Sequence, residues 1–308
     1  VWYSTSYLLD RKQSMNGCAK KRFENYKQQP LEFVFDKSFT GKLSQFGLDP
    51  NRRTPSGIKA AIIREKGTNG EREMAYMLYL AGFDVKDVTM TDLISGRDTL
   101  EDINMVVYCG GFSNSDVLGS AKGWAGSFLF NPKAKAALDN FYAREDTLSL
   151  GVCNGCQLMM ELGLITPEDK KKGKMLHNDS HKFESNFLGV TVPMNRSVMF
   201  GSLSGSKLGI WVAHGEGKFS LPYPEDHYNV VLKYSYDEYP GNPNGSDYSV
   251  AGIASQDGRH LAMMPHLERA CFPWENAYYP LDRKDNDQIT PWMEAFVNAR
   301  KWVEAHKK

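Results

Sequence analysis

Residues 151–157, GVCNGCQ, constrain the fold more than any other segment, because they place a cysteine where a strand turns sharply into a helix. Residues 148–152 are short, apolar and strand-like, and the apolar positions of 158–162 match the inward face of a helix. Gly151 and Gly155 remove side chains that would collide at such a bend. Cys153 is therefore expected at a helix N-terminus, where unpaired N–H groups and the helix dipole favour the thiolate. This is the environment of a nucleophile.

Other interpretations of Cys153 must be weighed against that one. A single cysteine at such a junction is often just a small buried apolar residue, and Cys153 with Cys156 could form a redox pair or half of a zinc site. A thioredoxin-like motif would have a Trp or Pro nearby, and none is present. The remaining candidate ligands stand singly or in a polar stretch without the HExxH pattern: Cys18, Cys109, Cys271, His177 and His181. We therefore expect no metal site.

Composition excludes several classes of partner. Lys plus Arg and Asp plus Glu both number 37 among the 308 residues, so the formal net charge is zero and predicts neither a nucleic-acid nor an anionic-membrane partner. No apolar stretch approaches the roughly 18 residues of a membrane span, and no signal peptide is visible. Five cysteines without a framework spacing fit a reducing compartment. We expect a cytoplasmic protein.

The chain divides into two parts at about residue 57. Residues 1–57 hold a basic run at 20–22, a short apolar stretch at 31–35 and several Gly and Pro breaks, which is typical of a connecting segment that docks onto something else. The first residue is Val rather than Met, which favours a piece of a longer polypeptide. Residues 58–308 are predicted to form one domain.

Strand and helix patterns alternate through this second part. Apolar strands are expected at 58–63, 85–90, 104–109 and 148–152, with helices opening at Glu71 and at Asn131-Pro132 between them. Residues 183–264 look more β-like, and Thr290-Pro291 caps a final helix. The pattern predicts an α/β fold whose mostly parallel sheet is covered on both faces. In such sheets the active site lies beyond the carboxyl ends of the strands, so Cys109-Gly110-Gly111 and Cys153 should be neighbours.

A nucleophilic cysteine needs a base and a group that orients the base. His266 and Glu268 follow Pro265, which biases the chain toward an extended conformation. Side chains two residues apart on an extended chain point the same way, roughly 6 to 7 Å apart, so that the carboxylate can reach the far imidazole nitrogen. On a helix the pair would point about 200° apart. An exposed His beside an exposed Glu is the alternative.

The sequence also offers donors for an oxyanion hole. Gly110-Gly111-Phe112-Ser113 follows a strand, and its backbone N–H groups can be approached closely by a ligand. The N–H groups of Gly111 and of Asn154, which follows the nucleophile, are the natural pair of donors. The two glycines could equally be a tight turn. Nothing resembles a Walker A loop, so these residues predict no ATP site.

With these three motifs in this order, the chain resembles the triad-type (class I) glutamine amidotransferases. It is most similar to the C-terminal glutaminase domains of formylglycinamidine ribonucleotide synthetases, a family of purine biosynthesis. The resemblance extends from about residue 55 to the C-terminus. It also rests on these motifs: Asp116–Gly119, Gly123–Ala125, Leu129–Asn131, Asn178-x-Ser180, Phe183-Glu184, His214–Gly217, Asn242–Ser246 and Pro291–Met293.

The resemblance implies a three-layer flavodoxin-like amidotransferase fold with additional β-rich segments. It implies that Cys153, His266 and Glu268 hydrolyse the side-chain amide of glutamine through a thioester, with Gly111 and Asn154 holding the oxyanion. Further substrate-binding or supporting residues would be Gly110, Phe112, Gln157, His214 and Glu216. Residues 1–57 would connect to an upstream synthetase region, the ammonia acceptor. ATP and Mg²⁺ would act in that region, and no cofactor or metal is expected in this chain.

Three positions depart from the family pattern. Leu267 stands where Pro is usual between the triad His and Glu, Asn186 stands where Arg is usual, and Asn114-Ser115 replaces Tyr-Gly. None removes a catalytic group, although Asn186 puts in doubt any salt bridge or partner contact that the family's Arg makes. Two other functions remain open: an independent cysteine hydrolase of γ-glutamyl compounds, and a non-catalytic docking module.

Overall fold

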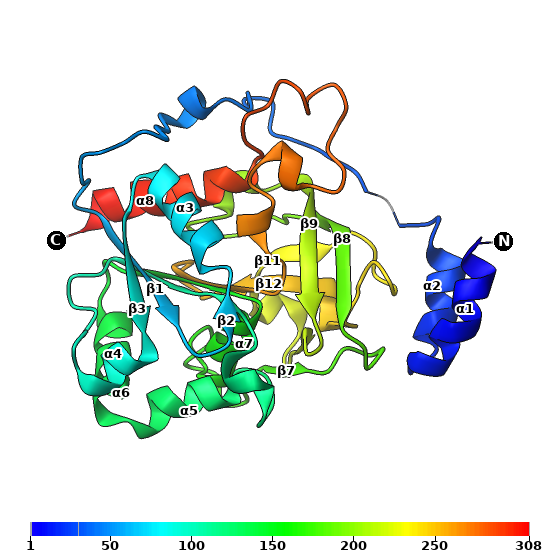
Figure 1. Ribbon diagram of the computed structural model, residues 1–308, viewed down its shortest axis with the longest axis horizontal. Coiled ribbons are helices and arrows are strands. Elements are labelled where there is room, and N and C mark those ends of the chain that lie inside the picture. The colour runs from blue at the N-terminus through cyan, green and yellow to red at the C-terminus, as the bar shows by residue number, and fades with distance from the viewer. Residues whose placement is uncertain (1, 30, 308) are drawn as a thin grey trace.

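The computed structural model describes residues 2–29 and 31–307 (Figure 1). Within them the main sheet has nine strands, the first five parallel and the last four antiparallel to their neighbours. Their order is β3 (Asp84–Thr89), β1 (Lys59–Arg64), β4 (Met105–Tyr108), β6 (Leu148–Val152), β13 (His260–Met263), β12 (Val250–Ala254), β11 (Asn229–Tyr234), β8 (Glu184–Thr191) and β9 (Lys207–His214). The α/β prediction is confirmed, and the β-like region 183–264 extends the sheet.

Helices cover both faces of this sheet (Figure 1). One layer holds α3 (Glu71–Ala81) and α8 (Trp292–His306), which contact each other. The other holds α4 (Met90–Ser95), α5 (Lys122–Phe130), α6 (Pro132–Ala143) and α7 (Asn154–Glu161). This is the three-layer arrangement expected from the alternation of strands and helices.

Local chemistry explains where the predicted helices begin and end. Asn131 caps α6, since its side-chain oxygen accepts from the backbone N–H groups of Lys133 and Ala134 at 3.1 and 3.0 Å. Gly82 ends α3 with a left-handed φ of 109°. The sequence reasoning did not anticipate α4, although Thr89 and Asp92 form a capping box at its start.

The remaining elements are short. Two-stranded sheets pair β2 (Thr68–Asn69) with β5 (Gly110–Gly111), and β7 (Lys174–Leu176) with β10 (Lys218–Ser220). Single 3₁₀ turns are η1 (Leu43–Phe46), η2 (Ser113–Asp116), η3 (Gly201–Leu203), η4 (Glu225–His227), η5 (Asp247–Ser249), η6 (Leu267–Arg269) and η7 (Pro273–Glu275).

The chain begins with a helical hairpin, α1 (Trp2–Gln13) and α2 (Cys18–Asn25), which lies beside β8 (Figure 1). Beyond it, Val34 forms an antiparallel bridge with Lys207 of β9, and Phe35 stacks on Tyr279. Part of the predicted connecting segment therefore packs on the sheet-containing part of this same chain. The boundary at residue 57 stays a prediction.

The core lies between the sheet and its helices. All residues of β4, β6, β12 and β13 are buried, as expected for strands covered on both faces. Among the described residues, no helix combines the length and the apolar character needed to cross a lipid bilayer.

Candidate active site

The candidate site lies where three neighbouring parallel strands end. Tyr108 of β4 pairs with Gly151 of β6, and Val152 of β6 pairs with Met263 of β13. The segments that follow these strands carry Gly110-Gly111, Cys153 and His266. The predicted proximity of the two glycines to Cys153 is confirmed, and the placement of β13 beside β6 brings His266 to the same edge.

Cys153 occupies a strained bend between β6 and α7. Its φ is 53° and its ψ is −106°, a region that residues with side chains rarely adopt. Two glycines make the bend possible. A Cβ at Gly155 would lie 2.0 Å from the carbonyl oxygen of Tyr108, and one at Gly151 would lie 2.5 Å from that of Gly155. The sequence prediction of a sharp strand-to-helix turn is confirmed.

The side chains of Cys153 and His266 meet above Gly110. A Cβ at Gly110 would lie 2.8 Å from Cε1 of His266 and 3.4 Å from the Cβ of Cys153. After Glu268, Cys153 is the neighbour that raises the pKa of His266. Cys153 Sγ also lies 3.5 Å from the carbonyl oxygen of Ala213 on β9. Cys153 and His266 are thus neighbours although 113 positions separate them in the sequence, the difference between 266 and 153.

Glu268 orients the His266 ring from behind, with Oε1 2.6 Å from Nδ1. His266 itself is extended, with φ −99° and ψ 91°, and bridges to Trp211. The prediction of a fully extended chain was wrong from Leu267 onward, because Leu267–Arg269 forms the 3₁₀ turn η6. The turn returns the Glu268 carboxylate to the imidazole, and Leu267 is buried in the core.

Electrostatics favour a charged His266–Glu268 pair. Burial alone lowers the pKa of His266, but the Glu268 carboxylate and the interaction of the imidazolium with the Cys153 sulfur outweigh burial and raise it to about 10. Burial raises the pKa of Glu268, and His266 more than offsets it, so the net shift is downward. Oε2 of Glu268 is buried without a hydrogen-bond partner. The imidazolium and, after it, the Arg269 guanidinium 3.7 Å from Oε1 favour the charged form of this carboxylate.

The adjoining secondary structure uses neither of the two N–H groups that are predicted as oxyanion donors. Phe112 N–H donates to the Gly67 carbonyl at 2.9 Å, so these two residues form a hydrogen-bonded pair at the end of the β2–β5 ladder. In an antiparallel ladder, hydrogen-bonded residue pairs alternate with pairs that share no hydrogen bond. The next pair, Gly111 with Thr68, is therefore an unbonded one, and β2 does not use the N–H of Gly111. Asn154 is the first residue of α7, so its N–H has no intrahelical partner. The oxyanion role itself stays a prediction.

The other predicted substrate contacts are anchored to protein groups. Gln157 donates from Nε2 to the Glu216 carbonyl at 2.8 Å and accepts at Oε1 from Asn154 at 2.9 Å. Phe112 is 48% exposed and lies against Phe183. Their contacts with a substrate stay predictions.

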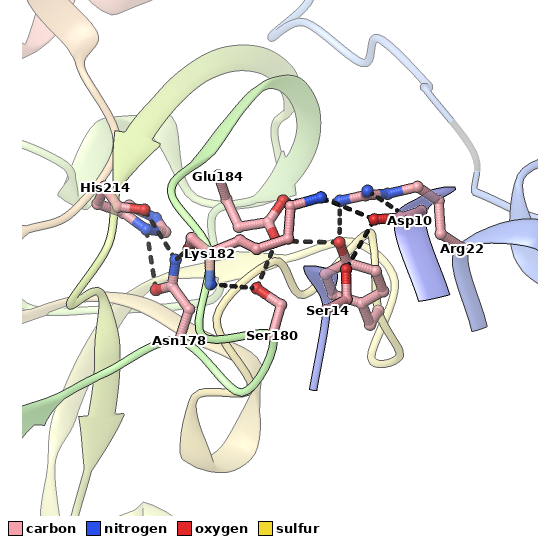
Figure 2. A network of polar contacts seen from close by, with 9 residues as sticks. Asp10, Ser14, Arg22, Asn178, Ser180, Lys182, Glu184 and His214 are labelled. Atoms are coloured by element: carbon pink, nitrogen blue, oxygen red, sulfur yellow. Dashed lines mark hydrogen bonds and ion pairs between the residues drawn. The ribbon is translucent and has the colours of Figure 1, made fainter. Parts of the chain in front are cut away.

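His214 is buried, and both of its ring nitrogens have partners. Nδ1 lies 3.1 Å from Oδ1 of Asn178, and Nε2 lies 3.4 Å from Nδ2 of Asn244. Figure 2 shows Asn178 between His214 and the hairpin side of the molecule. Sequence reasoning gave these two asparagines no role. The sequence feature that could have identified them is the group of polar side chains within the Asn178-x-Ser180 and Asn242–Ser246 motifs.

Cys156, the other cysteine of this motif, is fully buried in α7. Burial raises the pKa of the Cys156 thiol well above its usual value, which favours the uncharged form. Within residues 2–29 and 31–307, no group of three His, Cys, Asp or Glu side chains could hold a metal ion.

A surface pocket of about 600 Å³ reaches the base. His266, Trp211, Arg269 and Glu275 are among its lining residues. The half-buried Asn186, where the family usually has Arg, pairs with Val212 across β8 and β9. Its role stays open.

Known proteins are similar to this chain in sequence. Phosphoribosylformylglycinamidine synthases of Arabidopsis thaliana (named probable, chloroplastic/mitochondrial) and Homo sapiens are both 40% identical, over 99% and 98% of this chain. The chain spans only 23% and 24% of their lengths.

Two solved structures are also similar. PurLQS from Thermotoga maritima matches with a TM-score of 0.58 and 27% identity, over 82% of this chain and 99% of that one. A GMP synthase component from Thermoplasma acidophilum, named putative, shares the fold at 16% identity and a TM-score of 0.53, over 81% of this chain and 96% of that one.

A family model, the CobB/CobQ-like glutamine amidotransferase domain, matches residues 57–303. This range contains the Cys153 bend, the His266–Glu268 pair and both glycines of β5. The chain belongs to the CobB/CobQ-like glutamine amidotransferase family.

Proposed function

We propose that this chain hydrolyses the side-chain amide of glutamine and releases ammonia for phosphoribosylformylglycinamidine synthesis. The observation that carries the proposal is the contact of Cys153 with His266 above Gly110, with Glu268 2.6 Å behind the imidazole. A strained cysteine, a base and an orienting carboxylate are the parts that acyl transfer through a thioester requires.

The reaction begins when the Cys153 thiolate attacks the side-chain carbonyl carbon of glutamine. The carbonyl oxygen becomes an oxyanion between the N–H groups of Gly111 and Asn154, each worth on the order of 3 to 4 kcal/mol. His266 gives a proton to the departing nitrogen, the carbon–nitrogen bond breaks and ammonia leaves. Water then attacks the γ-glutamyl thioester while His266 takes its proton, so that glutamate leaves and the thiolate is restored.

The acceptor of the ammonia lies outside this chain. The chain spans about a quarter of the relatives named phosphoribosylformylglycinamidine synthase. The proposed partner is a synthetase region of the same enzyme, where ATP and Mg²⁺ drive the conversion of formylglycinamide ribonucleotide to its amidine. Residues 1–57 are the proposed connection to that region.

The decisive experiment is Cys153→Ala in this chain, with Cys156→Ser as the matched control. Cys153→Ala should abolish glutamine hydrolysis and labelling by diazo-oxo-norleucine, a glutamine-mimicking electrophile. Cys156→Ser should keep both, because Cys156 is buried in α7. Mass spectrometry locates the modified residue. Undiminished hydrolysis by Cys153→Ala would refute the proposal.

The two alternative functions give different results in the same assays. Rapid turnover of the isolated chain on a panel of γ-glutamyl compounds would indicate an independent hydrolase, because a glutaminase coupled to a synthetase should turn over slowly alone. A folded chain whose Cys153 never reacts would indicate a docking module.

We also propose a cytoplasmic location, supported by five free cysteines that are all buried. The name of the Arabidopsis relative, chloroplastic/mitochondrial, points the other way for that protein. Fractionation of cells that express the full-length protein would decide.

A further inference from the structure

Two polar motifs that the proposed mechanism does not use, Asn178-x-Ser180 and Asn242–Ser246, meet around one turn. The turn is residues 214–217, which follow β9 and contain the predicted substrate-binding residues His214 and Glu216. Asn178 packs on one side of it, and Asn244 with Ser246 pack on the other. All three side chains are buried.

Asn178 holds the 214–217 turn from one side with a single amide group. Its Nδ2 donates to the His214 carbonyl at 2.7 Å, and its Oδ1 accepts from Gly217 N–H at 3.0 Å. Its backbone N–H donates to the Gly215 carbonyl at 2.9 Å. The asparagine thus bonds three successive parts of the turn. A buried amide with every group satisfied fixes its surroundings, because leaving one of these groups unpaired costs free energy.

His214 completes the other side of the turn. Burial lowers its pKa to about 4, so the ring is neutral at pH 7 and needs one donor and one acceptor. The oxygen of Asn178 faces Nδ1 and the NH₂ group of Asn244 faces Nε2. This arrangement matches the tautomer with the proton on Nδ1, so the ring is held in one orientation.

Asn178 also belongs to a loop that the α1–α2 hairpin holds. We call residues 178–184 the docking loop. Lys182 Nζ donates to Asp10 of α1 at 2.7 Å, and Arg22 of α2 donates to Glu184 at 2.9 Å (Figure 2). Arg22 also pairs with Asp10 at 2.9 Å, which ties the two helices together. These ion pairs are partly buried, with side-chain exposures of 12 to 28% for Asp10, Lys182 and Arg22.

The contacts inside the docking loop connect the ion pairs to Asn178. Nδ2 of Asn178 donates to the Lys182 carbonyl at 2.9 Å. Ser180 donates from Oγ to Glu184 at 2.5 Å, and its carbonyl accepts from Met15 N–H at 3.0 Å. The turn therefore holds the first residue of the loop, Asn178, and the hairpin holds its centre and its last residue, Glu184.

On its far side the 214–217 turn reaches the nucleophile. The Glu216 carbonyl accepts from Gln157, which bonds Asn154 beside Cys153. The Ala213 carbonyl, just before the turn, lies 3.5 Å from Cys153 Sγ. A continuous set of hydrogen bonds and ion pairs therefore runs from the hairpin to the residues around Cys153.

We propose that Asn178 and Arg22 are positioning residues. The docked α1–α2 hairpin, through Arg22, fixes the position of the docking loop. Asn178, which belongs to that loop, in turn holds the 214–217 turn in the conformation that binds glutamine. The role in glutamine binding rests on the proposed function. The mechanical connection between the hairpin and the turn does not rest on the proposed function.

The test compares Arg22→Ala, Arg22→Lys and the control Lys20→Ala in the full chain. Lys20 lies on the same helix, and its ion pair with Glu24 is exposed. Hydrogen exchange of peptides covering 178–184 and 213–217 reports the connection without catalysis. Arg22→Ala should speed exchange in both segments by roughly tenfold, with Arg22→Lys in between and Lys20→Ala unchanged.

Glutamine hydrolysis provides the second readout. Arg22→Ala should raise KM for glutamine roughly fivefold and leave kcat within about twofold, since the turn binds substrate while Cys153, His266 and Glu268 keep their contacts. Faster exchange in 178–184 alone, with the turn and KM unchanged, would overturn the proposal. If the parent chain hydrolyses no glutamine, the proposed function fails and the exchange measurement still decides the connection.

Asn178→Ala tests the transmitting residue directly. It should speed exchange in 213–217 while residues 2–25 stay as protected as in the parent. Because Asn178 is fully buried, the fold is first checked by circular dichroism, and the Arg22 series decides independently if this variant does not fold. Unchanged exchange in the turn of folded Asn178→Ala would contradict the proposal.

Discussion

Different forces hold the α1–α2 hairpin and the proposed catalytic edge, which is the edge of the main sheet that carries Cys153, His266 and Glu268. Cys153, His266 and Glu268 are each at most 5% exposed and follow strands whose residues are all buried. α1 buries none of the side chains that the structure describes and α2 buries Cys18 and Ala19, while ion pairs of Asp10 and Arg22 join the hairpin to the docking loop. Close packing tolerates little displacement, whereas ion pairs at the surface respond to solvent and salt. The catalytic edge should therefore be rigid, and the hairpin adjustable.

Gly155→Ala should reduce stability and activity more than any other change considered, because it adds one methyl group where the catalytic edge has no space. Its Cβ would lie 2.0 Å from the Tyr108 carbonyl oxygen, which belongs to the backbone and cannot rotate away. We expect several kcal/mol of destabilisation and loss of glutaminase activity, measured by urea unfolding and by glutamate release.

Gly126→Ala is the matched control for that substitution. Gly126 also lies within a helix, α5, and an added Cβ there would meet only the Phe130 ring at 3.8 Å. Since Ala favours helices over Gly by about 1 kcal/mol, this variant should be as stable as the parent or slightly more so. A Gly155→Ala variant with parental stability would disprove rigid packing at the catalytic edge.

Glu268→Gln should damage catalysis while leaving the fold intact. The amide can still face Nδ1 of His266, but it cannot stabilise the imidazolium that forms in the reaction. We expect kcat to fall on the order of 10³- to 10⁴-fold, as for an orienting carboxylate replaced by an amide. Glu294→Gln, which removes an exposed carboxylate on α8, is the control. A loss of less than tenfold would remove Glu268 from the triad.

The same variant should change how stability depends on pH. The folded-state pKa of His266 is raised above its unfolded value near 6.5. The pair therefore stabilises the fold fully below pH 6.5, and this contribution is lost as pH rises toward the folded value of about 10. The parent should lose more stability than Glu268→Gln between pH 6.5 and 8.5, measured by urea midpoints. Parallel curves would mean that Glu268 does not control the His266 charge.

A higher salt concentration should produce the smallest effect, and it should change hydrogen exchange in the hairpin but not at the catalytic edge. Raising NaCl from 0.1 to 1 M shortens the screening length from about 10 to about 3 Å. Hydrogen exchange across residues 2–25 should increase about two- to threefold, because Arg22, Asp10 and Lys182 are partly exposed. Residues 148–161 of β6 and α7 should not change. An equal response in both regions would show that the hairpin is docked by packing instead.

Local patterns were enough to predict the bend at Cys153, the cap at Asn131 and the His266–Glu268 pair. Each depends on residues within a few positions of one another, where backbone sterics and short hydrogen bonds act. The extended conformation expected beyond Leu267 was wrong, because packing of Leu267 in the core accompanies a 3₁₀ turn there. The hairpin helices were not predicted, since their short polar sequences carry little periodic apolar signal.

By itself the sequence predicted which cysteine, which histidine and which carboxylate would come together, and it supplied the glycines without which the backbone at Cys153 could not bend. The tertiary structure alone decided that β13 lies beside β6, which puts His266 against Cys153, and that Asn178 lies between a surface hairpin and the 214–217 turn. The physical reason is the distance along the chain over which the deciding interactions act. Backbone conformation is set by neighbours in the chain, whereas strand order and buried polar contacts depend on the packing of the whole molecule.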